Sequence, residues 1–335
     1  MRQITIQDIA EECGISKMLV SAVLRNQKRS VRYSEETAVK IRKTAERLGY
    51  RPNLLARSLS RRKSDTIGLV TTIKEDGIAY LTETCIAIIE TATKNGYSVL
   101  ALNLYSKLNM AKEIDMLLNR QIEGIITLPN SGFFESEIRE KITASGLPWI
   151  SCFQEISDVD SVMPDLIKCT SLGMEYLCSK GYKHIAFITE GRSNSCLRAE
   201  KEYRKTLDRY GLEYHPQLIK RFNHSVQAGR DAMKKLFDGT VIPDAVFVTA
   251  DILAIGAIRV IRERGLKVPE DIAVLGWDNL QASLEFSDVP LTTIEPGKYE
   301  AGQKVCELLL EKIKKGPRKP KTIIIEPKLV MRASC

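Results

Sequence analysis

The sequence predicts two architectures in one chain: a small all-α module at the N-terminus, and a large α/β domain made of two doubly wound parallel-sheet subdomains. Three observations predict this division. Positive charge is concentrated at the N-terminus, apolar residues recur at helical spacing through the first 49 residues, and strand-length apolar runs alternate with helical stretches from Thr66 onwards. Such alternation is typical of parallel sheets that are covered by helices on both faces.

The charge divides unevenly between the two parts. Residues 1–63 contain 15 Lys and Arg against 6 Asp and Glu, a net charge of +9, whereas residues 64–335 contain 35 against 36. A basic module joined to a nearly neutral domain is typical of a nucleic-acid-binding head. A basic solubilising tail is the other interpretation, and the regular apolar spacing of the segment argues against it.

The first two expected helices are separated by a glycine turn. Thr5 is a suitable N-cap, and apolar residues follow at helical spacing over Ile6–Cys13. Gly14 supplies a tight turn, and Ser16 can cap a second helix whose apolar residues are Leu19, Val20, Val23 and Leu24. Helix, glycine turn and helix together indicate the helix-turn-helix motif.

A third helix and a short basic segment complete the head. Ser34 starts the third helix, and Gly49 is its expected C-cap. Pro52 then breaks the helix, and Asn53 can cap a segment of about two turns, which is too short to be stable alone in water. We therefore expect an all-α head over 1–51, a hinge segment over 52–63 that orders only against a partner helix or DNA, and an α/β domain over 64–335.

The second helix carries the expected base contacts. In a helix-turn-helix this helix lies in the major groove, with its N-terminal residues facing bases or phosphates. Lys17, Met18 and Ser21 occupy those positions. Packing in the core is the alternative for Met18 and for Leu19, and contact with a thymine methyl group is equally allowed for Leu19.

The head resembles the lac-repressor/galactose-repressor (LacI/GalR) family of bacterial transcription regulators. The resemblance lies in the order and spacing of Ile6–Ala10, Gly14–Ser16, Val20–Ser21, Ser34–Thr37, Leu48–Asn53 and Ala56–Leu59. It implies a homodimer on a pseudo-palindromic double-stranded DNA operator, in which paired hinge helices enter the minor groove and Leu59 is a wedge that kinks the duplex. The candidate DNA-contacting residues are Thr5, Ser16, Lys17, Met18, Leu19, Ser21, Asn26, Ser34, Thr37, Tyr50, Asn53, Ala56, Arg57 and Leu59.

Two features of the head depart from the family pattern. The family often has an arginine in the recognition helix where this chain has Ala22, so guanine reading from that position is lost. The following loop, residues 25–32, is about three residues longer than the family's by resemblance and is strongly basic. It is expected either to contact phosphates or to be a solvated charged loop.

Strands and helices are expected throughout the large domain. The expected strands are Thr66–Ile73, Ser98–Asn103, Gly124–Leu128, Pro148–Phe153, Ile185–Thr189, Ala245–Thr249, Ile272–Leu275 and Thr322–Ile325. The expected helices are Leu81–Asn95, Ala111–Arg120, Ser171–Lys180, Glu200–Tyr210, Val226–Phe237, Ile252–Arg264 and Tyr299–Lys314. In such folds a ligand binds at the carboxyl ends of strands, here in the cleft between subdomains.

This domain resembles the family's effector domain, which is similar to periplasmic sugar-binding proteins. The strings that carry the resemblance include Gly68–Val70, Glu123–Ile126, Lys180–Ile188, Arg264–Asp278 and Pro290–Ile294. The resemblance implies a small-molecule effector, and the candidate contacts are Asp278, Arg198, Asp251 and Trp277.

The match is weakest at these four positions. Asp278 aligns with a carboxylate that binds effector hydroxyls, and capping a turn is its alternative role. Asp251 has lost its preceding asparagine and is expected mainly to cap its own helix. Arg198 lies one residue before the position of the family's effector arginine, which is Ala199 here. No common sugar or purine can be inferred, and a domain that serves only as a dimerisation scaffold remains open.

Other function classes find little support. The eight cysteines contain no CxxC pair and are expected to be reduced core residues, and three isolated histidines are too few for a metal cluster. No cofactor motif occurs; an enzyme would have to use Ser193 or Ser195, which no histidine pattern supports. Neither a signal peptide nor a membrane span is expected, so the protein is expected in the cytoplasm. The family's C-terminal tetramerisation heptads are missing, which favours a dimer.

Overall fold

The computed structural model describes residues 4–24, 32–50, 63–72, 78–104, 110–128, 136–189, 191, 194–281 and 287–335. The chain forms two compact units, Met1–Ser64 and Asp65–Cys335.

The first unit contains the three predicted helices, α1 (Ile6–Cys13), α2 (Lys17–Leu24) and α3 (Glu35–Arg47). Thr5 caps α1 in a capping box with Asp8, whose backbone N–H donates to the Thr5 hydroxyl. Gly14 follows α1 in the left-handed conformation, with φ 68°, where a side chain is disfavoured. The hydroxyl of Ser16 accepts the Leu19 N–H at 3.3 Å at the start of α2. The predicted helix-turn-helix is therefore confirmed together with its caps.

The three helices close around one apolar core. Its buried residues come from every helix: Ile9, Ala10, Cys13, Val20, Val23, Ala38, Ile41 and Ala45. The hydroxyl of Ser34 accepts the Thr37 N–H and caps α3. The C-cap is Leu48, and Gly49 follows it with φ 67°, so the expected cap was placed one residue too late.

The second unit contains two six-stranded sheets. The first has the order β11-β5-β4-β3-β1-β2, and its adjacent strands are parallel. Its strands are β1 (Thr66–Thr71), β2 (Ser98–Asn103), β3 (Ile125–Leu128), β4 (Trp149–Cys152), β5 (Asp160–Pro164) and β11 (Thr322–Ile325). The associated helices are α5 (Ile78–Lys94), α6 (Met110–Leu118), α7 (Ser136–Ala144) and α13 (Lys298–Lys315).

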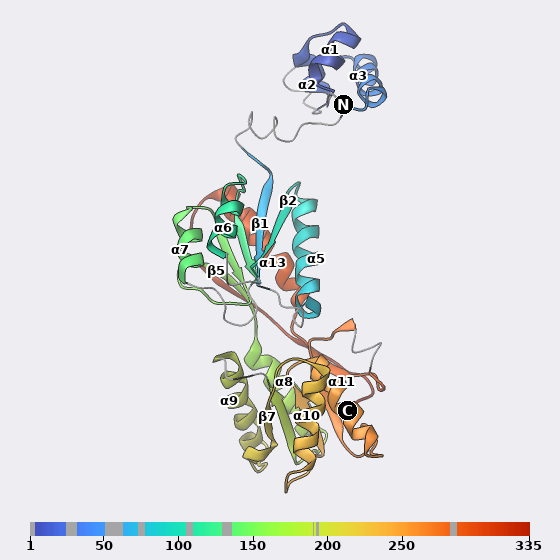
Figure 1. The fold of residues 1–335 in the computed structure, drawn as a ribbon, viewed down its shortest axis with the longest axis vertical. Helices are drawn as coiled ribbons and strands as arrows, with labels where there is room; N and C mark the ends of the chain where they lie inside the picture. The colour runs from blue at the N-terminus through green and yellow to red at the C-terminus, as the bar shows by residue number, and fades with distance from the viewer. Residues whose placement is uncertain are drawn as a thin grey trace. The chain divides into compact units, whose positions relative to one another are not determined.

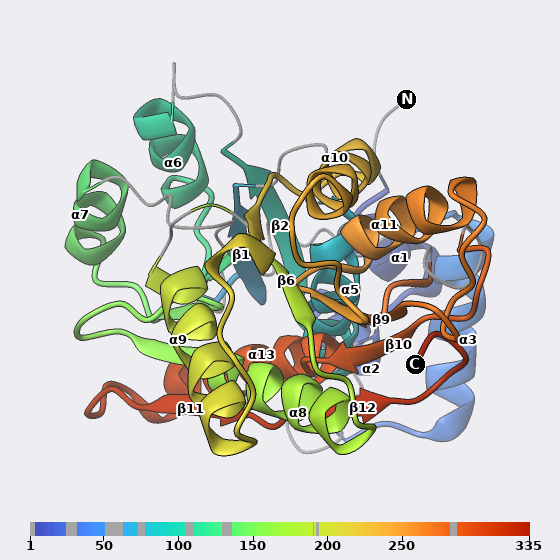
Figure 2. The ribbon, with the colours of Figure 1, turned by 90° about the horizontal axis from the view of Figure 1, so that it is seen from below.

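The second sheet has the order β12-β10-β9-β8-β6-β7. Its strands are β6 (Ile185–Thr189), β7 (Ile219–Arg221), β8 (Ala245–Val248), β9 (Ala273–Trp277), β10 (Thr292–Glu295) and β12 (Lys328–Val330). Its helices are α8 (Leu166–Ser179), α9 (Asn194–Arg209), α10 (Val226–Phe237) and α11 (Asp251–Glu263), with a 3₁₀ turn at Pro216–Leu218. Figure 2 shows α10 beside α11, and α8 beside β12. The edge strand β12 is antiparallel, which departs from the predicted all-parallel sheet.

Three connections join the two sheets. The chain passes from β5 to α8, returns from β10 to α13, and passes again from β11 to β12 (Figure 1). Helix α13 belongs to the first sheet, where it packs against α5 and against β3, β4 and β5. The segment between β10 and α13 is therefore one of the three crossings between the two sheets.

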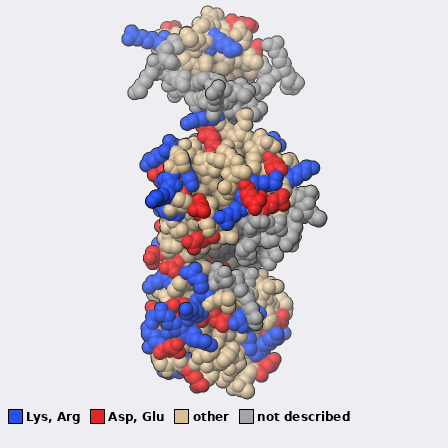
Figure 3. Space-filling view, turned by 90° about the vertical axis from the view of Figure 1, so that its left-hand side faces the viewer, with Lys and Arg blue, Asp and Glu red and all other residues tan. Residues whose placement is uncertain are grey.

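The surface of this unit and the thiols of the whole chain fit a reduced globular protein. Side chains of both signs, Lys and Arg with Asp and Glu, are mixed on the face of this unit that Figure 3 shows, as its near-zero net charge predicts. All eight cysteines are free, and five of them are buried, which confirms the predicted packing role for those five. No helix in the described part of the chain is long and apolar enough to span a bilayer.

Candidate DNA-binding surface and effector site

The N-terminal end of α2 presents Lys17 and Met18 to solvent. Lys17 is exposed and Met18 is 69% exposed, whereas Val20 and Val23, on the opposite side of the helix, are in the core. Leu19 is half-buried and packs against that core. The core alternative therefore fails for Met18 and holds in part for Leu19. Ser21 is half-buried, one turn after Lys17.

The remaining described candidates of the head support the ends of helices. Thr5, Ser16 and Ser34 are exposed caps, and the Thr37 hydroxyl lies 2.8 Å from that of Ser34. Tyr50 is half-buried against the core, and its N–H donates to the Ala45 carbonyl at 2.9 Å. Asn26, Asn53, Ala56, Arg57 and Leu59 lie outside the described residues, as do the basic loop over 25–31 and the hinge segment over 52–62.

Ala22 is buried on α2. Its side chain is 4% exposed, although the family's arginine at the matching position was expected to face DNA. Of the predicted contacts on α2, Lys17 and Met18 are exposed, and Leu19 and Ser21 are half-buried.

Asp251 does not cap α11. The cap residue is Ala250, and Asp251 is the first helical residue. Its buried carboxylate accepts the Thr293 hydroxyl at 2.6 Å and the Leu280 N–H at 2.8 Å. The expected cap is thus wrong: the side chain joins the start of α11 to β10 and to the turn after β9. A Cβ at Gly276 would lie 2.2 Å from an oxygen of Asp251, so this approach requires glycine there.

Asp278 begins the turn after β9, in a buried and strained position. It has φ 120°, and Asn279 follows with φ 52°, in a region that non-glycine residues seldom adopt. Asp278 is 5% exposed. Burial raises the pKa of Asp278 well above its usual value; Lys298 opposes this, and the nearby carboxylates of Asp251, Glu295 and Glu83 add to it.

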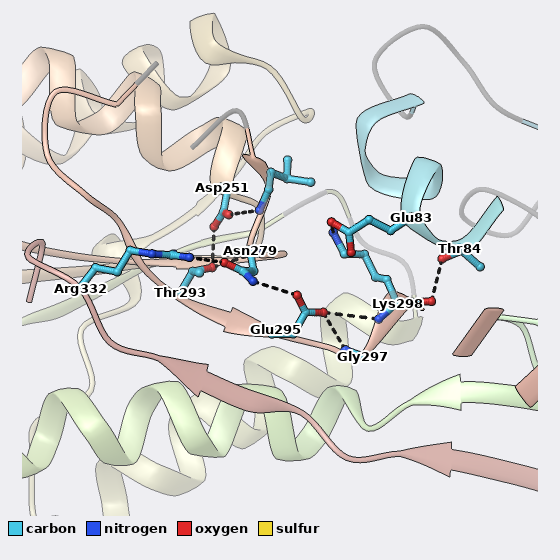
Figure 4. A network of polar contacts seen from close by, with 10 residues as sticks. Glu83, Thr84, Asp251, Asn279, Thr293, Glu295, Gly297, Lys298 and Arg332 are labelled. Carbon is cyan, nitrogen blue, oxygen red and sulfur yellow. Dashed lines mark hydrogen bonds and ion pairs between the residues drawn. The ribbon is translucent and has the colours of Figure 1, made fainter. Parts of the chain in front are cut away.

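A polar network surrounds this turn, as Figure 4 shows. The Arg332 guanidinium donates to the Asn279 side-chain carbonyl, and the Asn279 amide donates to Glu295 at 3.1 Å. The second oxygen of Glu295 accepts the N–H groups of Gly297 and Lys298.

Lys298 carries the network into the first subdomain. Its side chain is 1% exposed, and its ammonium group lies 3.6 Å from the Glu83 carboxylate on α5. Its backbone carbonyl accepts the Thr84 hydroxyl at 3.1 Å. Sequence reasoning missed Lys298, Glu83 and Glu295, because charged residues near helix ends are usually solvated. The one available signal was the Gly297-Lys298 pair at the start of α13.

The other two effector candidates, Trp277 and Arg198, do not take part in the polar network around Asp278. Trp277 is 5% exposed and stacks on Phe247 in the apolar core of the second sheet, with ring centroids 6.1 Å apart. Arg198 is exposed on α9 and is not among the charges that act on Asp278. Ala199 and Tyr203, at the family's arginine and aromatic positions, are buried in the same core as Trp277.

Known proteins match both units. Residues 5–53 match the model of bacterial regulatory proteins of the lacI family, and residues 174–335 match the periplasmic binding protein-like domain. The HTH-type transcriptional repressor PurR of Histophilus somni (strain 129Pt) is 30% identical over 98% of both chains. The chain belongs to the LacI family. CytR, an HTH-type transcriptional repressor of Escherichia coli (strain K12), is 30% identical to this LacI-family member over 92% of this chain and 89% of CytR.

The fold agrees with this assignment. The lac repressor dimer bound to operator and the anti-inducer ONPF superimposes with a TM-score of 0.82 and 25% identity, over 99% of both chains. The predicted architecture, a helix-turn-helix head and a periplasmic-binding-protein-like domain of two subdomains, is confirmed. As a LacI-family member, the chain is a DNA-binding transcription regulator and not an enzyme.

Proposed function

We propose that this LacI-family regulator is a cytoplasmic repressor that binds a pseudo-palindromic operator as a homodimer through the N-terminal face of α2, and that a small molecule bound at Asp278 changes its affinity for DNA. The observation that carries the DNA contact is the exposure of Lys17 and Met18 at the start of the second helix of the helix-turn-helix. Side chains at that end of the helix reach base edges and phosphates in the major groove.

The other candidates of the head have positioning roles in this proposal. Thr5, Ser16 and Ser34 fix the helix ends, and the hydroxyls and N–H groups at such ends also suit phosphate contacts. Asn26, Asn53, Ala56, Arg57 and Leu59 are retained as DNA contacts on the strength of the resemblance. Leu59 is proposed as the minor-groove wedge, which acts only where the central step can be kinked.

The proposed dimer face lies on α5 and on β2, the edge strand of the first sheet. Ile86 and Ile89 on α5 are 45% and 47% exposed, and Leu100 on β2 is 37% exposed. Apolar side chains gathered beside an open sheet edge favour association with a second copy. Ile89→Asp is expected to give monomers in analytical ultracentrifugation and to weaken operator binding, whereas Met116→Asp, which changes a 54% exposed residue on α6, should leave the dimer intact.

The DNA contact is tested on an operator selected from random DNA with the full-length protein. Lys17→Ala and Met18→Ala should each weaken binding about five- to a hundredfold, because a base contact contributes about 1–3 kcal/mol. The control is Lys43→Ala, which removes an exposed lysine from α3. Binding should also fall steeply with salt. Equal losses for Lys43 and Lys17 would contradict the assignment of α2 as the reading helix.

At the effector site, Asp278 is the proposed central contact, and Asp251 supports the turn that holds it. The core position of Trp277 and the exposed position of Arg198 make them the weaker members of the proposed set. An effector that stabilises the folded protein raises its melting temperature, so a thermal-shift screen of sugars, nucleosides and amines identifies binders. A domain that binds none of them would instead serve as a dimerisation scaffold.

A further inference from the structure

Among the described residues, more carboxylates than cations surround the turn after β9. Asp251, Glu295 and Glu83 all act on Asp278, and Lys298 is the ammonium group that opposes them. Lys298 and Glu295 also act on the carboxyl group of Glu83. Four carboxyl groups and one buried ammonium group thus form one electrostatic cluster, which joins the second sheet to α5.

Most of these carboxylates already have donors within the protein. Asp251 accepts from Thr293 and Leu280. Glu295 accepts from Asn279 and from the backbone of the segment that follows it. Glu83 lies within 3.6 Å of the Lys298 ammonium group. Their negative charge is held in place whether or not a ligand is present.

Asp278 differs from the other three. Its side chain is 95% buried, yet no described group donates a hydrogen bond to its carboxylate, and no described cation lies within ion-pair distance. A buried carboxyl group without donors loses its hydration without compensation. The backbone is also strained at Asp278 and Asn279, and such strain clusters at sites that bind ligands.

We infer that the effector carries a protonated amino group, and that Asp278 is its partner within the acidic cluster. The inference rests on the proposed function, which places the effector at Asp278. A bound ammonium group supplies the hydrogen-bond donors that Asp278 lacks and offsets the excess of carboxylates around Lys298. An anionic ligand, such as a phosphorylated sugar, would add negative charge to a cluster that already has an excess of it.

The test uses matched compounds that differ in the amino group. Glucosamine is compared with N-acetylglucosamine and with glucosamine 6-phosphate, and 1,4-diaminobutane is compared with 1,4-butanediol, by calorimetric titration of the full-length protein. At least one free amine should bind tenfold or more tightly than its neutral partner, and the phosphorylated compound should bind more weakly than the amine. Tighter or equal binding of the neutral or phosphorylated partner, or no binding of either amine, overturns the inference.

Two variants distinguish binding of the amine at this cluster from nonspecific binding to carboxylates elsewhere on the protein. Asp278→Asn keeps the shape of the side chain and should abolish the preference for the amine. Lys298→Met removes the internal competitor for the carboxylates and should strengthen amine binding. Asp238→Asn, which changes a carboxylate that is 74% exposed on the second unit, is the control and should change neither. Weaker amine binding by a folded Lys298→Met protein contradicts the inference.

The proposed function fails in a different way. If a neutral compound binds and Asp278→Asn weakens its binding, the placement of the effector site at Asp278 is supported and the inferred amino group of the effector is rejected. If a compound binds and Asp278→Asn leaves its affinity unchanged, the placement of the site at Asp278 is wrong.

Discussion

Replacing Asp251 by Ala tests how the turn that carries Asp278 is held. The substitution leaves two buried donors, the Thr293 hydroxyl and the Leu280 N–H, without their acceptor. Each unsatisfied buried donor costs about 1–3 kcal/mol, which gives about 2–6 kcal/mol for the pair. Removing the charge also relieves repulsion with Asp278, so we expect a loss in the lower half of that range. This loss corresponds to a melting temperature lower by about 4–12 °C.

Tryptophan fluorescence during urea unfolding measures this loss in the second unit alone, because Trp149 and Trp277 are the two tryptophans of the chain. Asp238→Ala, at an exposed carboxylate, is the matched control. Asp251→Ser separates the observed role from helix capping, since Ser is a good N-cap but has no second oxygen to reach both donors. A loss below about 1 kcal/mol for Asp251→Ala, or a neutral Asp251→Ser, would refute the bridging role, because capping alone contributes about that amount.

Three further outcomes follow from the same geometry. Thr5→Ala removes the capping box of α1 and should destabilise the head by about 1 kcal/mol, measured by circular dichroism, with Gln7→Ala on the exposed face of α1 as the control. Asp278→Asn should stabilise the protein at neutral pH, because the raised pKa of Asp278 means that its ionised form opposes folding. The gain in the free energy of unfolding should shrink as the pH falls toward the pKa of Asp278 in the unfolded chain. A gain that stays constant when unfolding is measured at several pH values would contradict this. Burial raises the pKa of Cys152 and Cys169, so both thiols should resist thiol reagents in the native protein, and rapid labelling resolved by mass spectrometry would show that these sites open.

The head was predictable because its determinants are local. Each cap lies next to the helix that it ends, and Gly14 marks the turn at the position where φ is positive. A helix that is capped by its own neighbours and has an apolar stripe can be recognised without knowledge of its partners. The hinge and the basic loop had no such determinants, and their interpretation still depends on the family resemblance.

In the large domain, predictability followed continuous apolar runs rather than burial, since Ile185–Thr189 is buried throughout whereas β2 and β11 are largely exposed. Continuous apolar runs predicted Ser98–Asn103, Ile185–Thr189 and Thr322–Ile325 at their observed bounds. The strands β5, β7, β10 and β12 and the helix α7 were missed, because they are short or carry polar residues. Strand β5 begins with Asp160, which is fully buried because Lys312 and Arg318 pair with it from more than 150 residues away. A local sequence pattern does not identify partners that lie so far away in the chain.

The same non-local chemistry limits prediction at the proposed effector site and connects that site to the first subdomain. Asp251 was interpreted by its neighbours as a cap, whereas its acceptor role is defined by residues 29 and 42 positions later. Lys298 likewise acquires its role from Glu83 and Thr84, which lie on α5 more than 200 residues earlier. Since the proposed dimer face also lies on α5, a ligand that competes for the charges around Lys298 would act on a helix of that proposed face. The contacts of Lys298 with Glu83 and Thr84 are therefore the link between the proposed effector site and the proposed dimer face.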